Sequence, residues 1–219
     1  MRHEPLLGKV ALVTGGSRGL GRSTAIGFGR AGADVILASR NVGDLEKVAE
    51  ELRQTNRRAM VLKAHLGRFQ DVQEVVSNVK GAFGRIDILV NNAAANPTIS
   101  SAIDVEEHAW DSIMNLNLKG LFFLSQGVAR IMKEEGGGCI INVSSLLGIR
   151  PDVLLPVYSI SKAAVIMATK VMAQEWGEIW HKGERGGSGP VQNQVQRSPL
   201  VRSKNPRPVC EEHPDGTYR

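Results

Sequence analysis

The stretch Lys9-Val-Ala-Leu-Val-Thr-Gly-Gly-Ser-Arg-Gly-Leu-Gly21 decides the fold. An apolar run over residues 9–15 leads into a glycine-rich turn, and residues 22–32 (RSTAIGFGRAG) continue with helical character. A strand, a glycine turn and a helix in this order are the setting in which a loop binds the phosphates of a dinucleotide at a helix N-terminus. The spacing is G-x-x-x-G-x-G rather than G-x-G-x-x-G, and many glycine turns bind nothing, so the flanking strand and helix carry the prediction.

The residues of this loop are expected to have distinct roles. Gly15, Gly19 and Gly21 would provide a positive φ at the turn, a close approach of the backbone to the pyrophosphate, and tight packing of helix on strand. The other loop residues expected to contact the cofactor are Ser17, Arg18 and Leu20.

Beyond the loop, short aliphatic runs alternate with longer stretches of helical period as far as Trp176. This alternation predicts βαβ units, and nearly continuous apolar runs are typical of strands buried on both faces. We therefore predict one α/β domain over residues 1–176, a three-layer doubly wound (Rossmann-like) parallel sheet of strand order 3-2-1-4-5. The predicted strands are residues 9–15, 33–39, 58–64, 86–92 and 138–145, and a largely buried helix is predicted over 156–176.

Composition excludes several classes of protein. The 219 residues are 42% hydrophobic and 22% charged, which is ordinary for a globular chain, and no apolar run is long enough to cross a bilayer. Residues 1–7 lack an export signal, and two cysteines are too few for a disulfide framework or a zinc site, so we expect a cytoplasmic protein without a metal. The net charge of +5 is spread along the chain, which argues against a nucleic-acid partner.

The end of the second predicted strand indicates which cofactor is bound. An acidic residue there would bind the ribose 2′-hydroxyl of NAD, but this chain has Arg40. A guanidinium suits a 2′-phosphate, and Arg18 provides a second cation, so we predict NADP rather than NAD. The alternative is that both arginines are merely solvated surface residues.

Tyr158 and Lys162 lie four residues apart at the start of the last helix and therefore share a face. An ammonium at ~4 to 6 Å can lower the pKa of a phenol by roughly the three units that proton transfer at neutral pH requires. Such a phenol can protonate a carbonyl oxygen while hydride arrives from a nicotinamide.

Taken together, these motifs resemble the short-chain dehydrogenase/reductase (SDR) family over about residues 8–176. The resemblance implies an NADP-dependent oxidoreductase that interconverts a carbonyl compound and a secondary alcohol. It implies that Tyr158 is the catalytic acid/base and that Lys162 lowers its pKa and holds the nicotinamide ribose. Ser145 would polarise the carbonyl, with Ser144 as the alternative, and Asn117 would position a water in the proton relay. The motifs are TGGSRGLG (14–21), NNAA (91–94), NLNLKG (115–120), INVSS (141–145) and YSISK (158–162).

The chain departs from the family pattern at two places. Ala94 replaces the usual glycine after Asn92 and Ala93, which are expected cofactor contacts, and it should be tolerated only with a negative φ. His65-Leu66 replaces an Asp-Val pair beside the adenine, so His65 is either an adenine contact or a solvated loop residue. The stretch GRIDILVNNAAANP resembles the branch of NADP-dependent carbonyl and retinol reductases.

Residues 177–219 differ in character: they hold five of the nine prolines and no Ala, Phe or Met. This composition predicts a disordered tail outside the family pattern. The family continues with a sixth strand, a Pro-Gly turn and a seventh strand, none of which we find here. Residues 178–190 are EIWHKGERGGSGP. If their codons are read from the second base of each, they can encode KYGIRVNAVAPG, which matches the sixth strand of the family and its Pro-Gly turn. We therefore predict that the C-terminal part of the family sequence is frameshifted from near Gly177 or truncated.

Without these strands, the fifth strand would be an exposed apolar edge, and we expect a marginal fold and impaired activity. The resemblance implies a homodimer through the helix after Ser101 and the Tyr-Lys helix, with a small carbonyl or alcohol as substrate. Two alternatives remain open. One is a catalytically dead nucleotide-binding remnant that acts only as a binding protein. The other is a Rossmann methyltransferase or similar protein, against which Ser145, Tyr158 and Lys162 argue.

Overall fold

The structure, a computed structural model, describes residues 4–96, 98–181 and 191–196. Its strands form one parallel sheet in the order β3-β2-β1-β4-β5-β6. The strands are β1 (Val10–Thr14), β2 (Asp34–Ser39), β3 (Ala59–Lys63), β4 (Ile88–Asn91), β5 (Cys139–Ser145) and β6 (Val191–Gln196). The helices are α1 (Gly19–Arg30), α2 (Val42–Arg53), α3 (Phe69–Phe83), α4 (Glu107–Met114), α5 (Leu121–Glu134) and α6 (Pro156–His181). A π-helical segment spans Asn115–Gly120, and single 3₁₀ turns span Ala102–Asp104 and Leu146–Gly148.

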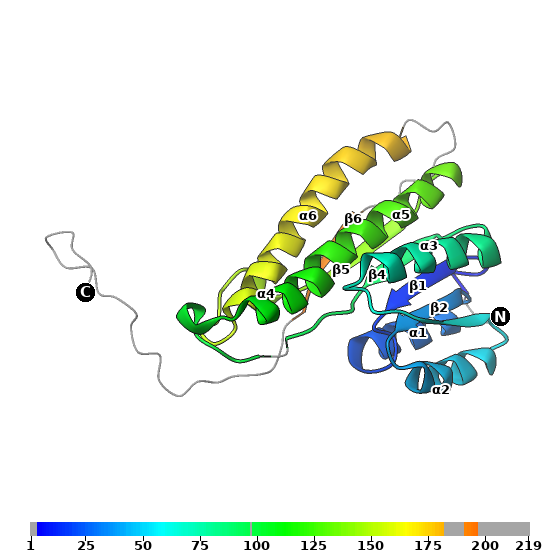
Figure 1. The fold of residues 1–219 in the computed structure, drawn as a ribbon. Helices are drawn as coiled ribbons and strands as arrows, with labels where there is room; N and C mark the ends of the chain where they lie inside the picture. The colour runs from blue at the N-terminus through cyan, green and yellow to red at the C-terminus, as the bar shows by residue number, and fades with distance from the viewer. Residues whose placement is uncertain (1–3, 97, 182–190, 197–219) are drawn as a thin grey trace, which may run out of the picture.

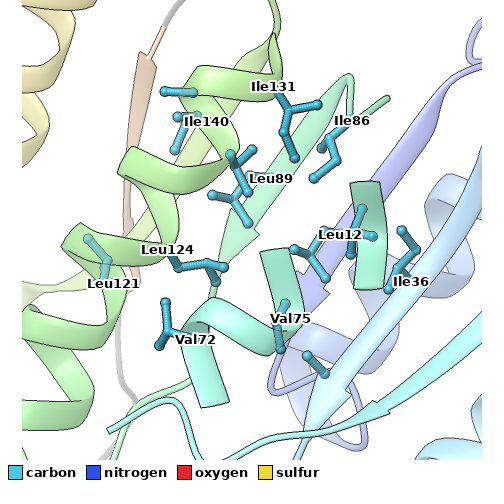
Figure 2. Close-up of a cluster of buried hydrophobic side chains, with 14 of the residues drawn as sticks. Leu12, Ile36, Val72, Val75, Ile86, Leu89, Leu121, Leu124, Ile131 and Ile140 are labelled. Carbon is cyan, nitrogen blue, oxygen red and sulfur yellow. The ribbon is translucent and has the colours of Figure 1, made fainter. Parts of the chain in front are cut away.

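The doubly wound arrangement confirms the predicted fold class and the 3-2-1-4-5 order of the first five strands. Helices α1 and α2 cover one face of the sheet, and α3, α5 and α6 cover the other (Figure 1). Between the second group and the sheet lies a large apolar cluster, part of which Figure 2 shows. Leu12, Ile36, Leu89 and Ile140 of the strands are all fully buried in it.

Local sequence explains why these helices begin, end and pack as they do. Helix α2 is capped by Asn41, whose side chain accepts a hydrogen bond from the backbone N–H of Asp44 at 3.3 Å. Its apolar residues recur at helical spacing and are buried against the sheet. Helix α3 ends at Gly84, whose φ of 70° is the left-handed conformation that glycine adopts most readily. The buried residues of α2 are Leu45, Val48, Ala49 and Leu52, and those of α3 are Val72, Val75 and Val79.

The prediction for the C-terminal part is wrong at two described places. Helix α6 continues past Trp176 to His181, and a sixth strand, β6, pairs with β5 from Ile140 to Ser145. The expected exposed edge of β5 is therefore covered. Ladder hydrogen bonds use backbone groups, so a polar segment such as VQNQVQ can pair wherever an edge offers free N–H and C=O groups. The rest of the predicted disordered tail and the seventh strand concern residues outside those described.

No helix in the described ranges is long and apolar enough to span a membrane. The same residues contain no group of three or more His, Cys, Asp or Glu side chains arranged to hold a metal ion.

Candidate active site

A cavity of about 360 Å³ opens at the carboxyl ends of the strands, where β1 and β4 lie side by side. The order of the strands reverses there, and doubly wound sheets bind ligands at this point. The cavity contains eight predicted cofactor residues: Gly15, Ser17, Arg18, Arg40, His65, Leu66, Asn92 and Ala93. Gly19, Leu20, Gly21, Tyr158 and Lys162 are not part of its lining.

The glycine loop has the geometry that the sequence predicted. Gly15 and Gly19 have φ values of 64° and 55°, which L side chains rarely adopt. A Cβ at Gly21 would overlap the carbonyl oxygen of Gly15, so the start of α1 packs directly against the end of β1. Helix α1 carries no acidic residue in its first turn, and its N-terminal N–H groups and positive dipole end suit a phosphate.

The segment after β4 holds the loop in place from the other side. The Asn92 side chain donates to the carbonyl oxygens of Thr14 and Gly15 at 3.0 and 3.2 Å. The Thr14 hydroxyl accepts from the backbone N–H groups of Asn92 and Ala93. Ala94 has no positive φ, which confirms the expectation for this departure from the family pattern. Asn92 and Ala93 thus support the phosphate loop as well as line the cavity.

Two arginines, one in the glycine loop and one after β2, give the cavity its positive charge. Arg18 and Arg40 both line it and are exposed to solvent. One carboxylate, Asp44, also lines it, but its oxygens accept hydrogen bonds from the Asn41 amide at 2.7 Å and from Lys47 at 3.1 Å. Because Asp44 is already paired, the two arginines remain available for an anion.

The four predicted catalytic residues come from three elements. Ser145 ends β5, Asn117 lies in the π-helical segment, and Tyr158 and Lys162 lie in the first two turns of α6. The Lys162 ammonium lies 5.6 Å from the centre of the Tyr158 ring and donates to the carbonyl oxygen of Val143 at 2.8 Å. Ser145 hydrogen-bonds Tyr158, so the hydroxyl, the phenol and the ammonium form one group.

The pKa values of this group differ from the prediction. Burial raises the pKa of Tyr158 above its ordinary value, and the hydrogen bond from Ser145 opposes this effect only in part. Burial also lowers the pKa of Lys162 to about 8, because its side chain is only 3% exposed. The predicted fall in the pKa of Tyr158 is therefore wrong for this geometry, because the effect of burial outweighs that of the hydrogen bond from Ser145. At neutral pH Tyr158 is protonated, as a general acid must be.

Two neighbouring side chains have structural partners. The Ser144 hydroxyl is fully buried and donates to the carbonyl oxygen of Lys162 at 2.9 Å, so Ser145 is the better placed serine. The Asn117 side chain accepts from the N–H of Ala95 at 2.8 Å and donates to the Ala95 carbonyl oxygen and to Ser161. The Asn117 amide therefore joins the segment after β4 to α6, and its role in positioning a water stays a prediction.

Six residues of the cavity were not predicted as contacts: Ser39, Asn41, Asp44, Ala64, Ala94 and Leu116. Ser39, Asn41 and Asp44 flank Arg40, and the helix-capping pattern Asn-x-x-Asp could have indicated that this turn reaches the site. Leu116 lies on the π-helical segment, and no local signal places it beside the end of β3.

Comparison with known proteins gives a consistent result. The model of the short chain dehydrogenase family matches residues 9–179. The 2-dehydro-3-deoxy-D-gluconate 5-dehydrogenase of Dickeya dadantii is 38% identical over 174 residues, which are 79% of this chain and 68% of that protein. Human dehydrogenase/reductase SDR family member 4 is 33% identical over 80% of this chain and 63% of its own length.

Solved structures agree with this assignment. A metagenomic short-chain oxidoreductase in complex with NADP has a TM-score of 0.79 and 30% identity, over 90% of this chain and 85% of that one. The L-sorbose reductase of Gluconobacter frateurii, complexed with NADPH and L-sorbose, has a TM-score of 0.77 and 31% identity, over 81% and 67% of the two chains. An NAD⁺-bound xylitol dehydrogenase has a TM-score of 0.76 and 28% identity, over 80% and 67%. The chain therefore belongs to the short-chain dehydrogenase family of NAD(P)-dependent oxidoreductases, which act on alcohols and carbonyl compounds.

Proposed function

We propose that this chain prefers NADP over NAD and reduces a carbonyl compound to a secondary alcohol. The observation that carries the cofactor preference is the pair Arg18 and Arg40 at the rim of the cavity. The end of β2 offers no free carboxylate for a ribose 2′-hydroxyl, because Asp44 is paired with Asn41 and Lys47. Two guanidinium groups would bind a 2′-phosphate by charge-assisted hydrogen bonds.

The residues near Tyr158 have the chemistry that such a reduction needs. The protonated Tyr158 hydroxyl donates its proton to the carbonyl oxygen, and the Ser145 hydroxyl donates a hydrogen bond to the same oxygen. Lys162 holds the nicotinamide ribose and, when protonated, stabilises the phenolate that Tyr158 leaves behind. Asn117 positions the segment after β4 through Ala95. A bound reduced nicotinamide would supply the hydride.

Titration with NADPH and NADH tests the cofactor proposal. We expect NADPH to bind more tightly than NADH. Arg40→Ala should weaken NADPH about tenfold and leave NADH nearly unchanged, because only NADPH carries a 2′-phosphate for Arg40 to bind. Arg30→Ala, at the exposed end of α1, is the matched control. Equal affinity for both nucleotides in the parent chain would contradict the preference.

For the substrate we infer an apolar carbonyl compound, as in the branch of NADP-dependent carbonyl and retinol reductases. The segment that follows Ser145 carries exposed apolar side chains: Leu146, Ile149, Val153 and Leu154 are 41%, 62%, 70% and 51% exposed. It leads directly into Tyr158, so it borders the place where a carbonyl must bind. NADPH oxidation with aromatic or long-chain ketones should exceed that with keto sugar acids, and the reverse order would overturn this inference.

For the assembly we propose a homodimer through α4 and α6, which pack against each other. Ile160, Met167 and Val171 lie on one face of α6 and are 47%, 59% and 49% exposed, and Trp110 of α4 is 40% exposed. Light scattering should give the mass of a dimer, and Met167→Glu should give a monomer, whereas Gln73→Glu on α3 should change nothing. A monomeric parent chain would refute this assembly.

For the C-terminal part we propose that the sequence after Gly177 is read out of frame and that turnover is impaired as a result. The family match ends at residue 179, and the shifted codons of residues 178–190 permit the strand and Pro-Gly turn of the family. The coding DNA tests this directly: codons that do not encode KYGIRVNAVAPG in the shifted frame would refute it. Restoring the frame should raise turnover.

The same observation favours a second candidate, a nucleotide-binding chain without turnover. The cavity depends on residues before Leu121, all upstream of the shift, so NADPH binding could outlast catalysis. A titration that shows NADPH binding, with no NADPH oxidation across a carbonyl panel, would favour this candidate. Restoring the frame should then bring activity back.

A further inference from the structure

Two segments next to the catalytic residues carry exposed apolar side chains. One segment, residues 98–104, follows β4 and includes Ile99 and Ile103, which are 76% and 91% exposed. The other segment, residues 146–155, follows β5 and includes Val153, which is 70% exposed. Exposed aliphatic side chains that gather beside a site are typical of a surface that contacts an apolar ligand.

A hydrogen bond joins the two segments to each other. The backbone N–H of Ser100 donates to the carbonyl oxygen of Leu154 at 3.1 Å. Ile99 precedes one end of this bond and Val153 precedes the other, so both apolar residues lie close to the place where the segments meet. The position of residues 98–104 is therefore linked to the position of the Leu154 carbonyl group.

Asp152 holds the turn that contains Leu154. Its carboxylate accepts a hydrogen bond from the backbone N–H of Leu154 at 2.9 Å, and its carbonyl oxygen accepts from the N–H of Leu155 at 3.2 Å. An aspartate side chain that accepts from the N–H two residues further on forms an Asx turn. The direction of the Leu154 carbonyl group therefore depends on Asp152.

The Ser159 hydroxyl fastens this turn to the first turn of α6. It accepts from the backbone N–H of Asp152 at 3.3 Å and donates to the carbonyl oxygen of Leu155 at 2.8 Å. Ser159 is 4% exposed and directly follows Tyr158 in the chain. The single hydroxyl proton is used on Leu155, so the lone pairs of the oxygen hold the N–H of Asp152. Ser159 thus fixes the turn relative to the helix that carries Tyr158.

The start of the segment after β5 is fixed independently of Ser159. A Cβ at Gly148 would lie 2.8 Å from the carbonyl oxygen of Lys162, so the backbone there packs directly on α6. The N–H of Leu147 donates to the Ser145 hydroxyl at 3.2 Å. Loss of the Ser159 hydroxyl should therefore loosen the turn at Asp152 and leave this part of the segment in place.

We propose that the two segments form one wall for the apolar part of the substrate and that Ser159 is the positioning residue that holds this wall. The inference rests on the proposed reduction of an apolar carbonyl compound. Hydrogen bonds lead from Ser159 through the turn at Asp152 and Leu154 to Ser100, so a change at Ser159 affects both segments. A wall that is already ordered binds a long apolar group more tightly than a loosened one, because less conformational entropy is lost on binding.

Hydrogen exchange of the Ser100 amide tests the link between the segments in the absence of substrate. Ser159→Ala and Asp152→Ala should each raise its exchange rate about tenfold, because each removes a hydrogen bond that orders the turn at Leu154. Asp152→Asn keeps an oxygen that can accept from the N–H of Leu154 and should retain the parent rate. Ser77→Ala, on the exposed face of α3, is the control. An unchanged rate in Ser159→Ala would overturn the inference, and if that variant does not fold, equal rates in Asp152→Ala and Asp152→Asn would overturn it.

Kinetics with a long-chain methyl ketone and with butanone test the contact with the substrate. In Ser159→Ala the KM for the long-chain ketone should rise about tenfold with little change in kcat, so the selectivity for it over butanone should fall by a similar factor. Equal losses with both ketones would show a general structural role for Ser159 and would overturn the inference while the proposed function stands. If the parent chain reduces neither ketone with NADPH, the proposed function fails and the proposed wall fails with it.

Discussion

The two sides of the site are built by different means. The cofactor side, which comprises the Gly15–Gly21 loop, Arg18 and Arg40, uses backbone geometry and exposed cations. The catalytic side uses buried side chains: Ser145 and Lys162 are 2% and 3% exposed. The first kind of site is specified by local sequence, and the second depends on what the fold packs around it. Changes on the first side should therefore alter cofactor binding most, and changes on the second side should alter proton transfer most.

The largest effect should come from the backbone of the cofactor side. Gly21→Ala would place a Cβ against the carbonyl oxygen of Gly15 and close to the Asn92 amide. We expect NADPH affinity to fall more than a hundredfold and the free energy of unfolding to fall by about 2 kcal/mol, because both contacts are with ordered groups. Isothermal titration and urea unfolding measure the two effects.

Gly27→Ala, on the same helix, is the matched control. A Cβ there meets nothing within 4 Å, so alanine should keep NADPH affinity and stabilise the chain by up to about 1 kcal/mol through helix propensity. If Gly21→Ala and Gly27→Ala have the same NADPH affinity and the same free energy of unfolding, close packing at Gly21 does not determine the conformation of the loop.

The next largest effect is on the catalytic side, where a substitution should raise the free energy of unfolding instead of lowering it. The pKa of Lys162 is about 8 in the folded chain, against an ordinary value of 10.5. Below pH 8 Lys162 is protonated in both the folded and the unfolded chain, and the buried ammonium lowers the stability of the folded chain. Between pH 8 and 10.5 the unfolded chain holds more protons than the folded chain, so the free energy of unfolding rises with pH. Lys162→Met should therefore stabilise the chain at pH 7 by about 2 kcal/mol and flatten this rise.

Urea unfolding between pH 6 and 10.5 measures this, with Lys170→Met, an exposed lysine of the same helix, as the control. A less stable Lys162→Met variant at pH 7 would show that the ammonium contributes more through its bond to Val143 than its burial costs.

The smallest effect concerns the buried hydrogen bonds behind the catalytic side. The Asn142 amide donates to the Thr169 hydroxyl at 3.0 Å, and both side chains are buried. Thr169→Val keeps the shape but leaves that N–H without an acceptor, so the free energy of unfolding should fall by about 1 kcal/mol. Ser77→Ala on the exposed face of α3 should be neutral, and equal values for the two variants would mean that the Asn142 amide finds another partner.

The contrast between the cofactor side and the catalytic side also explains which features could be predicted from the sequence. The loop glycines, Arg40, the five strands and the start of α6 at Pro156 were predictable, because each depends on local spacing or on a residue type that few other positions need. The raised pKa of Tyr158 was not, because it depends on burial by distant segments. The same holds for the Asn117 contact with Ala95, which joins segments far apart in the chain.

The strand β6 was missed for a different reason. Its pairing with β5 uses backbone groups, and the polar segment VQNQVQ lacks the apolar run by which the other strands were found. The Asp44 and Leu116 positions in the cavity were missed because only the folded chain brings the end of β2 and the π-helical segment to the same space.

The most direct test of the central claim, that binding and chemistry reside on separate sides of one site, is the Tyr158→Phe variant assayed for both. We expect an NADPH dissociation constant within about twofold of the parent and carbonyl turnover reduced about a thousandfold, since Phe keeps the ring and removes only the proton donor. A variant that turns over at the parent rate, or that no longer binds NADPH, would contradict it.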